Sequence, residues 1–390
     1  MKKILSILLV ISMVTTLAAG CGTTSNSDPV SSSAGDQSAK DIKIGVAGPM
    51  TADYAIWGES TLQGAQIAVD EFNEKGGLNG RKVAIVPVDD KGDPKEAATV
   101  AQKLVNDPDV VAVVGHNFSA AVLTAAPIYQ REGLPHVVVT ASNPKIPDVG
   151  DCIFTISLND NQISYKMADY AVLEMGWKKI AILRENSDYG VATETAFTEQ
   201  TIKNGGEIVA VETYLAGQDR DFSVQLTKIR ETDPDCILLA GFATEAGLIV
   251  QQASQLGIKK QFYGVDGVNS DVFFELGKES AEGTIIATLF DRGVEEAKPF
   301  VDKYEKKYNE EIFSTSPYAY DAMNVVLTAL TRAESVDRKG LRDAIADTNN
   351  ANLTGVTGKI VFAENGLRDA GWLAMIIYEN GEVKVKDIYK

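Results

Sequence analysis

The feature that most constrains the fold is an alternation of short apolar runs with helical patterns. The runs are rich in β-branched residues, and each ends in Gly, Asp, Asn or Ser before a helical pattern begins. The strands that they predict span residues 42–47, 83–88, 110–114, 136–140, 180–183, 208–213, 236–240, 261–265 and 284–289. Continuous apolar strands are typical of parallel sheets that are buried on both faces. Their alternation with helices predicts an α/β fold.

The strand pattern restarts near the middle of the chain. Residues 153–157 form a strand-like connector, and a new helix is expected at Asn161. A chain of 390 residues has room for two or three domains of about 150 residues each, and one open sheet would not comfortably hold all the predicted strands. We therefore predict two doubly wound parallel-sheet lobes. One comprises residues 41–156 and 287–370, and the other comprises residues 157–286 and 371–390.

The first twenty residues are typical of a secretory signal peptide. Lys2 and Lys3 give a positive start, and residues 4–17 are apolar but too few to span a bilayer comfortably. The sequence LAAGC at residues 17–21 resembles the lipobox of bacterial lipoproteins, in which cleavage before the cysteine leaves its thiol to be lipidated. We predict a signal peptide over residues 1–20 and lipidation at Cys21. The alternative is a chance cysteine beside an ordinary cleavage site.

A polar segment separates this leader from the body of the protein. Residues 22–40 are rich in Ser and Gly and contain Val30 as their single large apolar residue, so they have too little apolar surface to form a core. We predict a flexible tether over residues 21–40, with an end-to-end distance of about 25 Å. No later run of apolar residues is long enough to span a membrane. These features predict an extracytoplasmic protein that is lipid-anchored to the bacterial membrane, at the cell surface or in the periplasm.

Charge and composition exclude several classes of function. The 37 Lys and Arg against 54 Asp and Glu give a net charge of −17, which would repel nucleic acid. The two His and three Cys have no metal-ligand spacing, so we expect no metal. Phosphate-loop, dinucleotide-binding, nucleophile-elbow and zinc-protease motifs are all missing, so we predict no cofactor and no catalytic residues. Cys152 and Cys236 are most simply buried free thiols, although a disulfide between them stays open.

The candidate site lies in the loops that follow the predicted strands, because ligands of doubly wound sheets bind beyond the carboxyl ends of the strands. Ser119 opens a helix, where its hydroxyl and the free backbone amides suit a carboxylate. Asp266 follows a strand and can pair with an ammonium group. Taken alone, each is equally explained by a helix cap or a turn. The ligand-binding residues that we predict are Trp57, Asn117, Phe118, Ser119, Thr140, Ala141, Ser142, Tyr189, Phe242 and Asp266.

A series of short motifs runs through the chain in a characteristic order. They are IKIG at 42–45 with GPM at 48–50, WG at 57–58 with GA at 64–65, KGGLNG at 75–80, DD at 89–90 with DP at 93–94, GH at 115–116, DYG at 188–190, DFS at 221–223, AEG at 281–283 and YDA at 320–322. The series covers about residues 42–389. It resembles the branched-chain amino acid binding proteins of the Leu/Ile/Val type, the extracytoplasmic receptors of ABC importers, in a lipoprotein form.

The resemblance implies the type I periplasmic binding protein fold, two lobes joined by three crossover strands, which closes on an amino acid by a hinge motion. It implies that Ser119 and the backbone of Ser142 hold the α-carboxylate. The Thr140 carbonyl, the Ser142 hydroxyl and Asp266 would hold the α-ammonium. The residues that would surround the side chain are Trp57, Phe118, Tyr189 and Phe242.

This sequence departs from the family pattern at the site. One member of the family has Tyr where Phe242 stands and Glu where Asp266 stands, so this chain lacks a hydroxyl and has a shorter acid. The same member bridges the positions that match Gly92 and Phe118 with a disulfide, which this chain cannot form. The identity of the preferred side chain is therefore open.

Three hypotheses follow. The first is a solute receptor, expected to be monomeric, that captures a small neutral amino acid, Leu, Ile or Val above all, and delivers it to a membrane permease. The second is a receptor of the same fold for an amide, urea, aromatic acid or dicarboxylate, which would leave Asp266 without a cationic partner. The third is a secreted hydrolase that uses Ser119 with His116, but these residues are three apart at a strand-to-helix corner, which disfavours a hydrogen bond between them.

Overall fold

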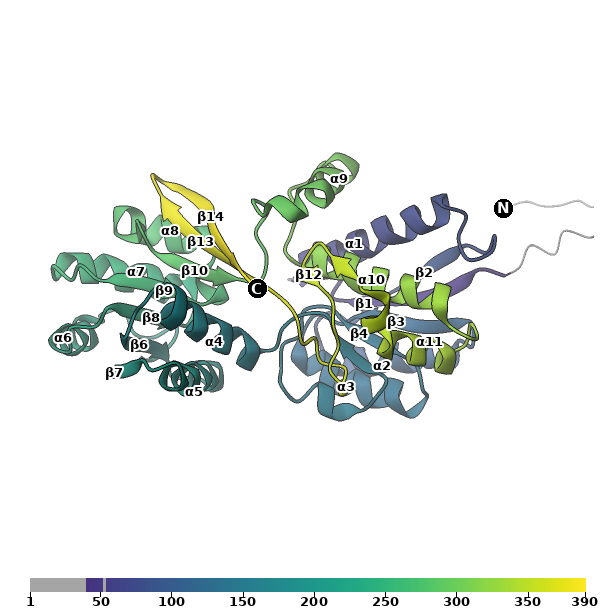
Figure 1. Cartoon of the computed structure of the whole chain (residues 1–390), viewed down its shortest axis with the longest axis horizontal. Coiled ribbons are helices and arrows are strands. Elements are labelled where there is room, and N and C mark those ends of the chain that lie inside the picture. Colours follow the sequence, from purple (N-terminus) through teal and green to yellow (C-terminus); the bar gives the residue numbers. More distant parts are fainter. Residues whose placement is uncertain (1–39, 52–53) are drawn as a thin grey trace, which may run out of the picture. The chain divides into compact units, whose positions relative to one another are not determined.

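The computed structural model of the chain describes residues 40–51 and 54–390, which fall in one compact unit, Ala39–Lys390. The predicted signal peptide, Cys21 and almost all of the predicted tether lie outside the described residues. Two sheets, each covered by helices, carry the fold (Figure 1). Within the described ranges, every helix is too short or too polar to cross a membrane.

The first lobe is built on a five-stranded sheet in which every neighbouring pair is parallel, with the order β2-β1-β3-β4-β5. Its strands are β1 (Ile42–Gly48), β2 (Val83–Asp89), β3 (Val110–Gly115), β4 (His136–Val138) and β5 (Ile153–Thr155). Its main helices are α1 (Ala55–Glu74), α2 (Pro94–Asn106), α3 (Ser119–Arg131), α9 (Lys298–Tyr308), α10 (Thr315–Arg332) and α11 (Arg338–Ala346). Shorter elements are η2 (Pro147–Val149), α12 (Thr348–Ala351), β11 (Thr354–Gly355) and β12 (Gly358–Lys359).

Helices cover both faces of this sheet because its strands are apolar on both sides. Ile44 and Val46 of β1 pack into the core that α1, α10 and α11 share. Ala47 of the same strand packs into the core formed with α2 and α3. Side chains of a strand alternate between the two faces of its sheet, so the continuous apolar run of β1 fills two cores at once.

The second lobe is built on a seven-stranded sheet with the order β14-β13-β10-β9-β8-β6-β7. Its strands are β6 (Lys179–Glu185), β7 (Glu207–Tyr214), β8 (Cys236–Ala240), β9 (Gln261–Gly264), β10 (Ile285–Thr288), β13 (Leu373–Glu379) and β14 (Glu382–Tyr389). Its helices are α4 (Asp160–Asp169), η3 (Tyr170–Glu174), α5 (Asp188–Lys203), α6 (Ser223–Glu231), α7 (Ala243–Gln255), η4 (Asp266–Val268), α8 (Asp271–Gly277) and η5 (Lys278–Ala281). Another short turn, η6 (Glu295–Ala297), precedes α9.

This second sheet is mixed, whereas the sequence predicted parallel strands alone. β13 pairs antiparallel with both β10 and β14. The turn between β13 and β14 consists of Asn380 and Gly381, with φ of 56° and 77°. Two residues with positive φ make the tight turn that a right-twisted hairpin favours, and a hairpin is necessarily antiparallel.

The chain passes between the two sheets three times. It leaves β5 for α4, leaves β10 for α9, and returns from the β11–β12 pair to β13. The second passage begins after Thr288, two residues beyond the predicted boundary, because all four residues of β10 pair in the seven-stranded sheet. The two α/β lobes and their interleaved chain confirm the predicted fold class.

Cys152 and Cys236 are buried free thiols, which confirms the simpler of the two predictions made for them. Cys152 lies just before β5, and burial raises its pKa to about 11. Cys236 begins β8, where burial also raises its pKa. Neither thiol is therefore a reactive group at neutral pH.

Candidate functional site

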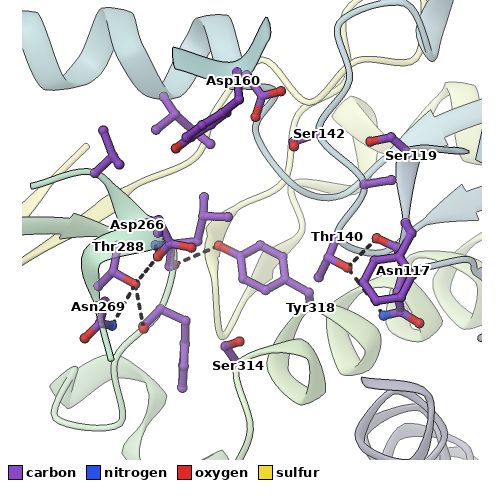
Figure 2. A pocket seen from close by; sticks show the side chains of 18 of the residues that line it. Asn117, Ser119, Thr140, Ser142, Asp160, Asp266, Asn269, Thr288, Ser314 and Tyr318 are labelled. Atoms are coloured by element: carbon purple, nitrogen blue, oxygen red, sulfur yellow. Dashed lines mark hydrogen bonds between the residues drawn. The ribbon is translucent and has the colours of Figure 1, made fainter. Parts of the chain in front are cut away.

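A pocket of about 520 Å³ lies at the carboxyl ends of strands from both sheets (Figure 2). Its walls come from the loops after β3, β4, β8 and β9, from the end of β10, and from the first turns of α4 and α5. All ten residues predicted from the sequence line it: Trp57, Asn117, Phe118, Ser119, Thr140, Ala141, Ser142, Tyr189, Phe242 and Asp266. The structure thus brings together side chains that are more than two hundred residues apart in the sequence. Their contact with a ligand stays a prediction.

The first lobe offers neutral hydrogen-bond donors to the pocket. Ser119 is the first residue of α3, and the N-cap residue, Phe118, makes no hydrogen bond with its side chain to the helix. The first amides of a helix have no partner within the helix, and together with the helix dipole they favour an anion. The Ser119 hydroxyl accepts a hydrogen bond of 3.3 Å from the backbone amide of Asn143. Its proton is free to point into the pocket.

Asn117 anchors the loop after β3 and has one buried acceptor without a partner. Its side chain is only 3% exposed, and its Nδ2 donates to Thr61 Oγ1 at 2.9 Å. The Oδ1 atom of Asn117 is buried without a hydrogen-bond partner among the residues that the structure describes. Thr140 donates from its hydroxyl to the Asn117 carbonyl at 3.1 Å. This oxygen lies against β1, where a Cβ built on Gly48 would stand 2.6 Å from it, so Asn117 supports the loop rather than offering this acceptor to a ligand.

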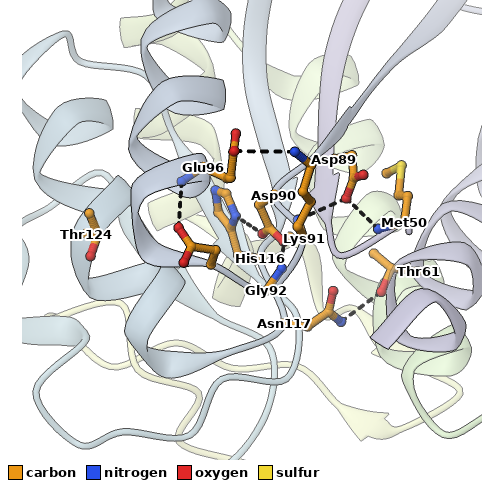
Figure 3. A network of polar contacts seen from close by, with 12 residues as sticks. Met50, Thr61, Asp89, Asp90, Lys91, Gly92, Glu96, His116, Asn117 and Thr124 are labelled. Carbon is orange, nitrogen blue, oxygen red and sulfur yellow. Dashed lines mark hydrogen bonds and ion pairs between the residues drawn. The ribbon is translucent and has the colours of Figure 1, made fainter. Parts of the chain in front are cut away.

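The loop that presents Asn117 and Ser119 rests on a buried polar network (Figure 3). His116 Nδ1 lies 2.5 Å from Asp90 Oδ2, and His116 Nε2 lies 3.1 Å from the hydroxyl of Tyr129. His136, the other histidine, donates from Nε2 to the Gly115 carbonyl at 2.6 Å, and burial together with the nearby His116 lowers its pKa to about 3. The hydrolase that would use His116 with Ser119 is not supported, because His116 is fully buried on these partners.

The second lobe offers carboxylates. Asp266 lies in η4, directly after β9, and its Oδ1 accepts hydrogen bonds from Thr288 Oγ1 at 2.5 Å and from the Leu289 amide at 3.3 Å. Burial raises the pKa of Asp266 above its ordinary value, although these two hydrogen bonds oppose the effect. A carboxylate that burial destabilises in its charged form gains most from a cationic partner.

Asp160 is a second carboxylate that the sequence reading missed. It is the first residue of α4, whose capping box is formed by Asn159 and Gln162. Its amide donates to the Ser142 carbonyl at 3.1 Å, which places the first turn of α4 beside the loop after β4 (Figure 2). Burial raises the pKa of Asp160, and a hydrogen bond with Ser142 lowers it by less. Its position at the start of a predicted helix after the connector was the available signal.

Aromatic rings from each lobe form apolar walls. In the first lobe the Trp57 ring lies 5.4 Å from that of Phe118 and 5.1 Å from that of Phe313, measured between centroids. In the second lobe Tyr189 and Phe242 stack at 5.6 Å. The Phe242 side chain is 51% exposed, which is unusual for a large aromatic residue and leaves apolar surface for another molecule.

Phe118 also explains the two positions that a family member bridges by a disulfide. Gly92 has a φ of +70°, and a Cβ built on it would stand 3.0 Å from the Phe118 ring. The two positions are therefore neighbours in space, as the resemblance implied. Here a ring packed over a glycine occupies the place of the bridge.

Several polar lining residues come from segments that carry no local sign of a site in their sequence. Tyr318 of α10 is almost fully buried and donates from its hydroxyl to the Leu289 carbonyl at 2.8 Å. Asn269 donates to Thr288 Oγ1 at 3.4 Å, and Ser314 precedes α10. Among the described residues that line the pocket, two are acidic and none is Lys, Arg or His.

Comparison with known proteins identifies the family to which the chain belongs. The Periplasmic binding protein family matches residues 41–378. The leucine-, isoleucine-, valine-, threonine-, and alanine-binding protein of Pseudomonas aeruginosa is 32% identical over 332 residues, which cover 83% of this chain and 86% of the relative. The Leu/Ile/Val-binding protein of Escherichia coli is 30% identical over 299 residues, which cover 76% of this chain and 81% of the relative.

Solved structures agree in fold. The branched-chain amino acid transporter substrate binding protein LivJ of Streptococcus pneumoniae, in complex with isoleucine, superposes with a TM-score of 0.71 at 33% identity and covers 89% of this chain and 98% of its own. The leucine binding protein LivK of Thermotoga maritima gives a TM-score of 0.71 at 30% identity and covers 90% of this chain and 99% of its own.

Proposed function

This chain belongs to the periplasmic binding protein family, and on that premise we propose that it captures a branched-chain amino acid outside the cytoplasm and delivers it to an ABC importer. Its relatives are solute-binding proteins of ABC transporters and not enzymes, in agreement with the prediction that the chain has no catalytic activity. The choice of ligand rests on the chemistry of the pocket.

The observation that carries the proposal is the separation of charge preference across the pocket. Ser119 and the first amides of α3 form a neutral site for an anion on the first lobe. Asp266 and Asp160 provide negative charge from the second lobe. A zwitterion with its α-carboxylate toward Ser119 and its α-ammonium toward Asp266 satisfies both sites at once. We propose that Asp160 adds to the attraction for the ammonium.

The apolar walls support a ligand with an aliphatic side chain. Trp57 and Phe118 belong to the first lobe, and Tyr189 and Phe242 to the second. An apolar side chain held between these rings loses contact with water, at about 25 cal/mol per Å². An amino acid of about nine heavy atoms, at no more than about 1.5 kcal/mol per atom, can reach the roughly 8 kcal/mol that micromolar affinity requires.

The same charges disfavour the alternative ligands. A dicarboxylate or an aromatic acid would bring negative charge to a lining that holds two acids and, within the described residues, no base. A urea or an amide has no cation for Asp266, whose pKa burial already raises. Each of these ligands would leave a half-buried carboxylate without a charged partner, which costs free energy.

A thermal-shift screen tests the ligand class. The panel holds the twenty amino acids, leucinamide without the carboxylate, isovalerate without the ammonium, benzoate, succinate and urea. A ligand at one hundred times its Kd stabilises the native state by about 2.7 kcal/mol, so we expect Leu, Ile and Val to raise the melting temperature clearly. Leucinamide and isovalerate should have little effect, since each satisfies one side of the pocket. A clear shift with benzoate, succinate or urea and none with any amino acid would contradict the proposal.

We also propose that Cys21 carries the lipid anchor. The proposal is supported by the LAAGC sequence at residues 17–21 and by the extracytoplasmic function of the family. Mass spectrometry of the protein from a bacterial membrane fraction should find an acylated N-terminal cysteine, and Cys21→Ala should move the protein to the soluble fraction. An unmodified Cys21 in membrane-associated protein would contradict lipidation.

A further inference from the structure

Arg368 is a buried cation that the ligand site does not use directly. Its side chain is 1% exposed, and it lies in the segment between β12 and β13 where the chain makes its third passage between the sheets. An arginine so fully buried is rare unless its guanidinium is paired or fully hydrogen-bonded. Its partners therefore indicate why it is there.

The partners of this guanidinium are almost all backbone carbonyls. Nη1 donates to Ile156 O at 2.7 Å, and Nε donates to Ala370 O at 2.5 Å. Nη2 donates to the carbonyls of Thr357 at 2.9 Å and Lys359 at 2.8 Å. Nη1 also donates to the Thr357 hydroxyl at 2.8 Å, which in turn donates to the buried Asp321 at 2.6 Å. All three guanidinium nitrogens of Arg368 thus donate hydrogen bonds.

These contacts tie together segments that are distant in the sequence. Ile156 belongs to the first passage, and Ala370 belongs to the third. The backbone reinforces the link, since the Thr155 amide donates to Gly366 O at 2.9 Å and the Arg368 amide donates to Thr155 Oγ1 at 3.3 Å. Two of the three passages are therefore held at one point by a single side chain.

A second contact leads from Arg368 to the pocket. Gln162 Nε2 donates to the Arg368 carbonyl at 2.8 Å. Gln162 is also half of the capping box of α4, where its Oε1 accepts from the Asn159 amide at 3.0 Å and its own amide donates to Asn159 Oδ1 at 2.9 Å. Asp160, one of the two residues between Asn159 and Gln162, lines the pocket. The guanidinium of Arg368 thus holds the chain before Asp160, at Ile156, and the main-chain carbonyl of the same residue accepts from Gln162 on the other side.

We propose that Arg368 is a positioning residue for ligand binding, which fixes the first turn of α4 and so aims Asp160 into the pocket. The inference rests on the proposed function for its ligand and on the hydrogen bonds above for its geometry. Lysine cannot replace arginine here, because three donors on a flexible stem cannot fill a site built for a planar fork of five.

The test compares Arg368→Lys with Arg338→Lys. Arg338 is a matched control, because its guanidinium also donates to backbone carbonyls, those of Val105, Asp107 and Val110, but it does not line the pocket. Calorimetry with leucine should show affinity about tenfold weaker for Arg368→Lys and a change within about twofold for Arg338→Lys. Both variants are first checked by circular dichroism and melting temperature.

A double-mutant cycle separates positioning from a general effect on the fold. In the Asp160→Asn background, Arg368→Lys should weaken leucine binding by no more than about threefold, because Asp160 no longer contributes its charge. An equal loss in both backgrounds, or no loss at all, would overturn the proposal. If Arg368→Lys does not fold, Gln162→Met breaks the link from the other side without touching the buried guanidinium, and the same cycle is run with it.

Hydrogen exchange makes the test independent of the ligand. In the ligand-free protein, the amides of Gln162 and Ile163 should exchange faster in Arg368→Lys than in wild type, and should be unchanged in Arg338→Lys. Unchanged exchange in Arg368→Lys would overturn the positioning of α4. If the wild-type protein binds no amino acid, the proposed function is contradicted. The exchange result then still decides whether Arg368 fixes the first turn of α4.

Discussion

The two lobes contribute opposite chemistry to one pocket. The first lobe presents hydroxyls, an amide side chain and a helix N-terminus, and none of its described lining residues is charged. The second lobe presents Asp266 and Asp160, both with a pKa that burial raises. On the proposed function, each lobe alone would bind an amino acid weakly, because each offers a partner to only one of the ligand's two charges.

On the proposed function, the difference teaches that charge selection resides mainly in the second lobe. A neutral site of amides and hydroxyls accepts any carboxylate, whereas a half-buried acid favours a cation. The following predictions test this division, beginning with the change that should affect binding most.

Removing Asp266 should affect binding more than any change on the first lobe. Asp266→Ala leaves the ligand ammonium without its main partner, and we expect leucine affinity to fall by about 2–5 kcal/mol. Isothermal titration calorimetry gives the value directly. Asp271→Ala, which removes an exposed acid from the same lobe at the start of α8, is the control and should bind as wild type does. Equal affinities for Asp266→Ala and wild type would remove Asp266 from the site.

Removing the Ser119 hydroxyl should have a smaller effect. Ser119→Ala loses one hydrogen bond to a charged group while the helix amides remain, so we expect about 1–2 kcal/mol of lost leucine affinity. The weak binding of leucinamide, which has no carboxylate, should be unchanged. Thr124→Ala deletes a hydroxyl farther along α3, where it donates to Ala120 O, and serves as control. A larger loss than that of Asp266→Ala would reverse the assignment of the dominant lobe.

The smallest effect concerns the stability of the ligand-free protein. Because the folded pKa of Asp160 is raised, the folded state binds more protons than the unfolded chain between the two pKa values. Stability therefore falls as the pH rises through that window and stays reduced above it. Asp160→Asn removes this cost, so the variant should melt about 2 °C higher than wild type at pH 7. The difference should disappear as the pH falls below the pKa of the unfolded carboxyl.

Asp235→Asn is the control of opposite sign. Two backbone amides, those of Lys179 and Lys178, lower the pKa of Asp235, so its carboxylate contributes stability above the ordinary pKa. This variant should melt lower than wild type at pH 7. If Asp160→Asn also melts lower, the Asp160 carboxylate is stabilised in the empty pocket, and the contrast between the lobes is weaker than we infer.

Most of the fold could be predicted because a buried strand shows as a short run of apolar, β-branched residues in the sequence. The β8 strand matches its prediction at both ends, and β1 differs by one residue. The predicted strand at 136–140 ends early, at Val138, and beyond it Thr140 donates its hydroxyl to the Asn117 carbonyl beside the pocket. The β13–β14 hairpin was missed. β14 is an edge strand with charged residues at alternate positions, so it lacks the continuous apolar run that marked the others.

The site was predictable to the extent that it follows strand ends. All ten predicted residues, among them Ser119 and Asp266, line one pocket because the carboxyl ends of parallel strands meet there. Tyr318 could not be found in this way, since it lies within a helix whose spacing indicates only a buried face. Arg368 was equally hidden, because nothing in its neighbours indicates that its guanidinium makes six hydrogen bonds to five acceptors, one of them on the distant Ile156.

The interleaving of the chain between the sheets has a consequence for biogenesis. β13 pairs between β10 and β14, so the larger sheet lacks two strands until the ribosome has released residues 373–389. Contacts of such high sequence separation slow folding. A nascent chain that cannot complete either lobe early should therefore fold only near the end of its synthesis.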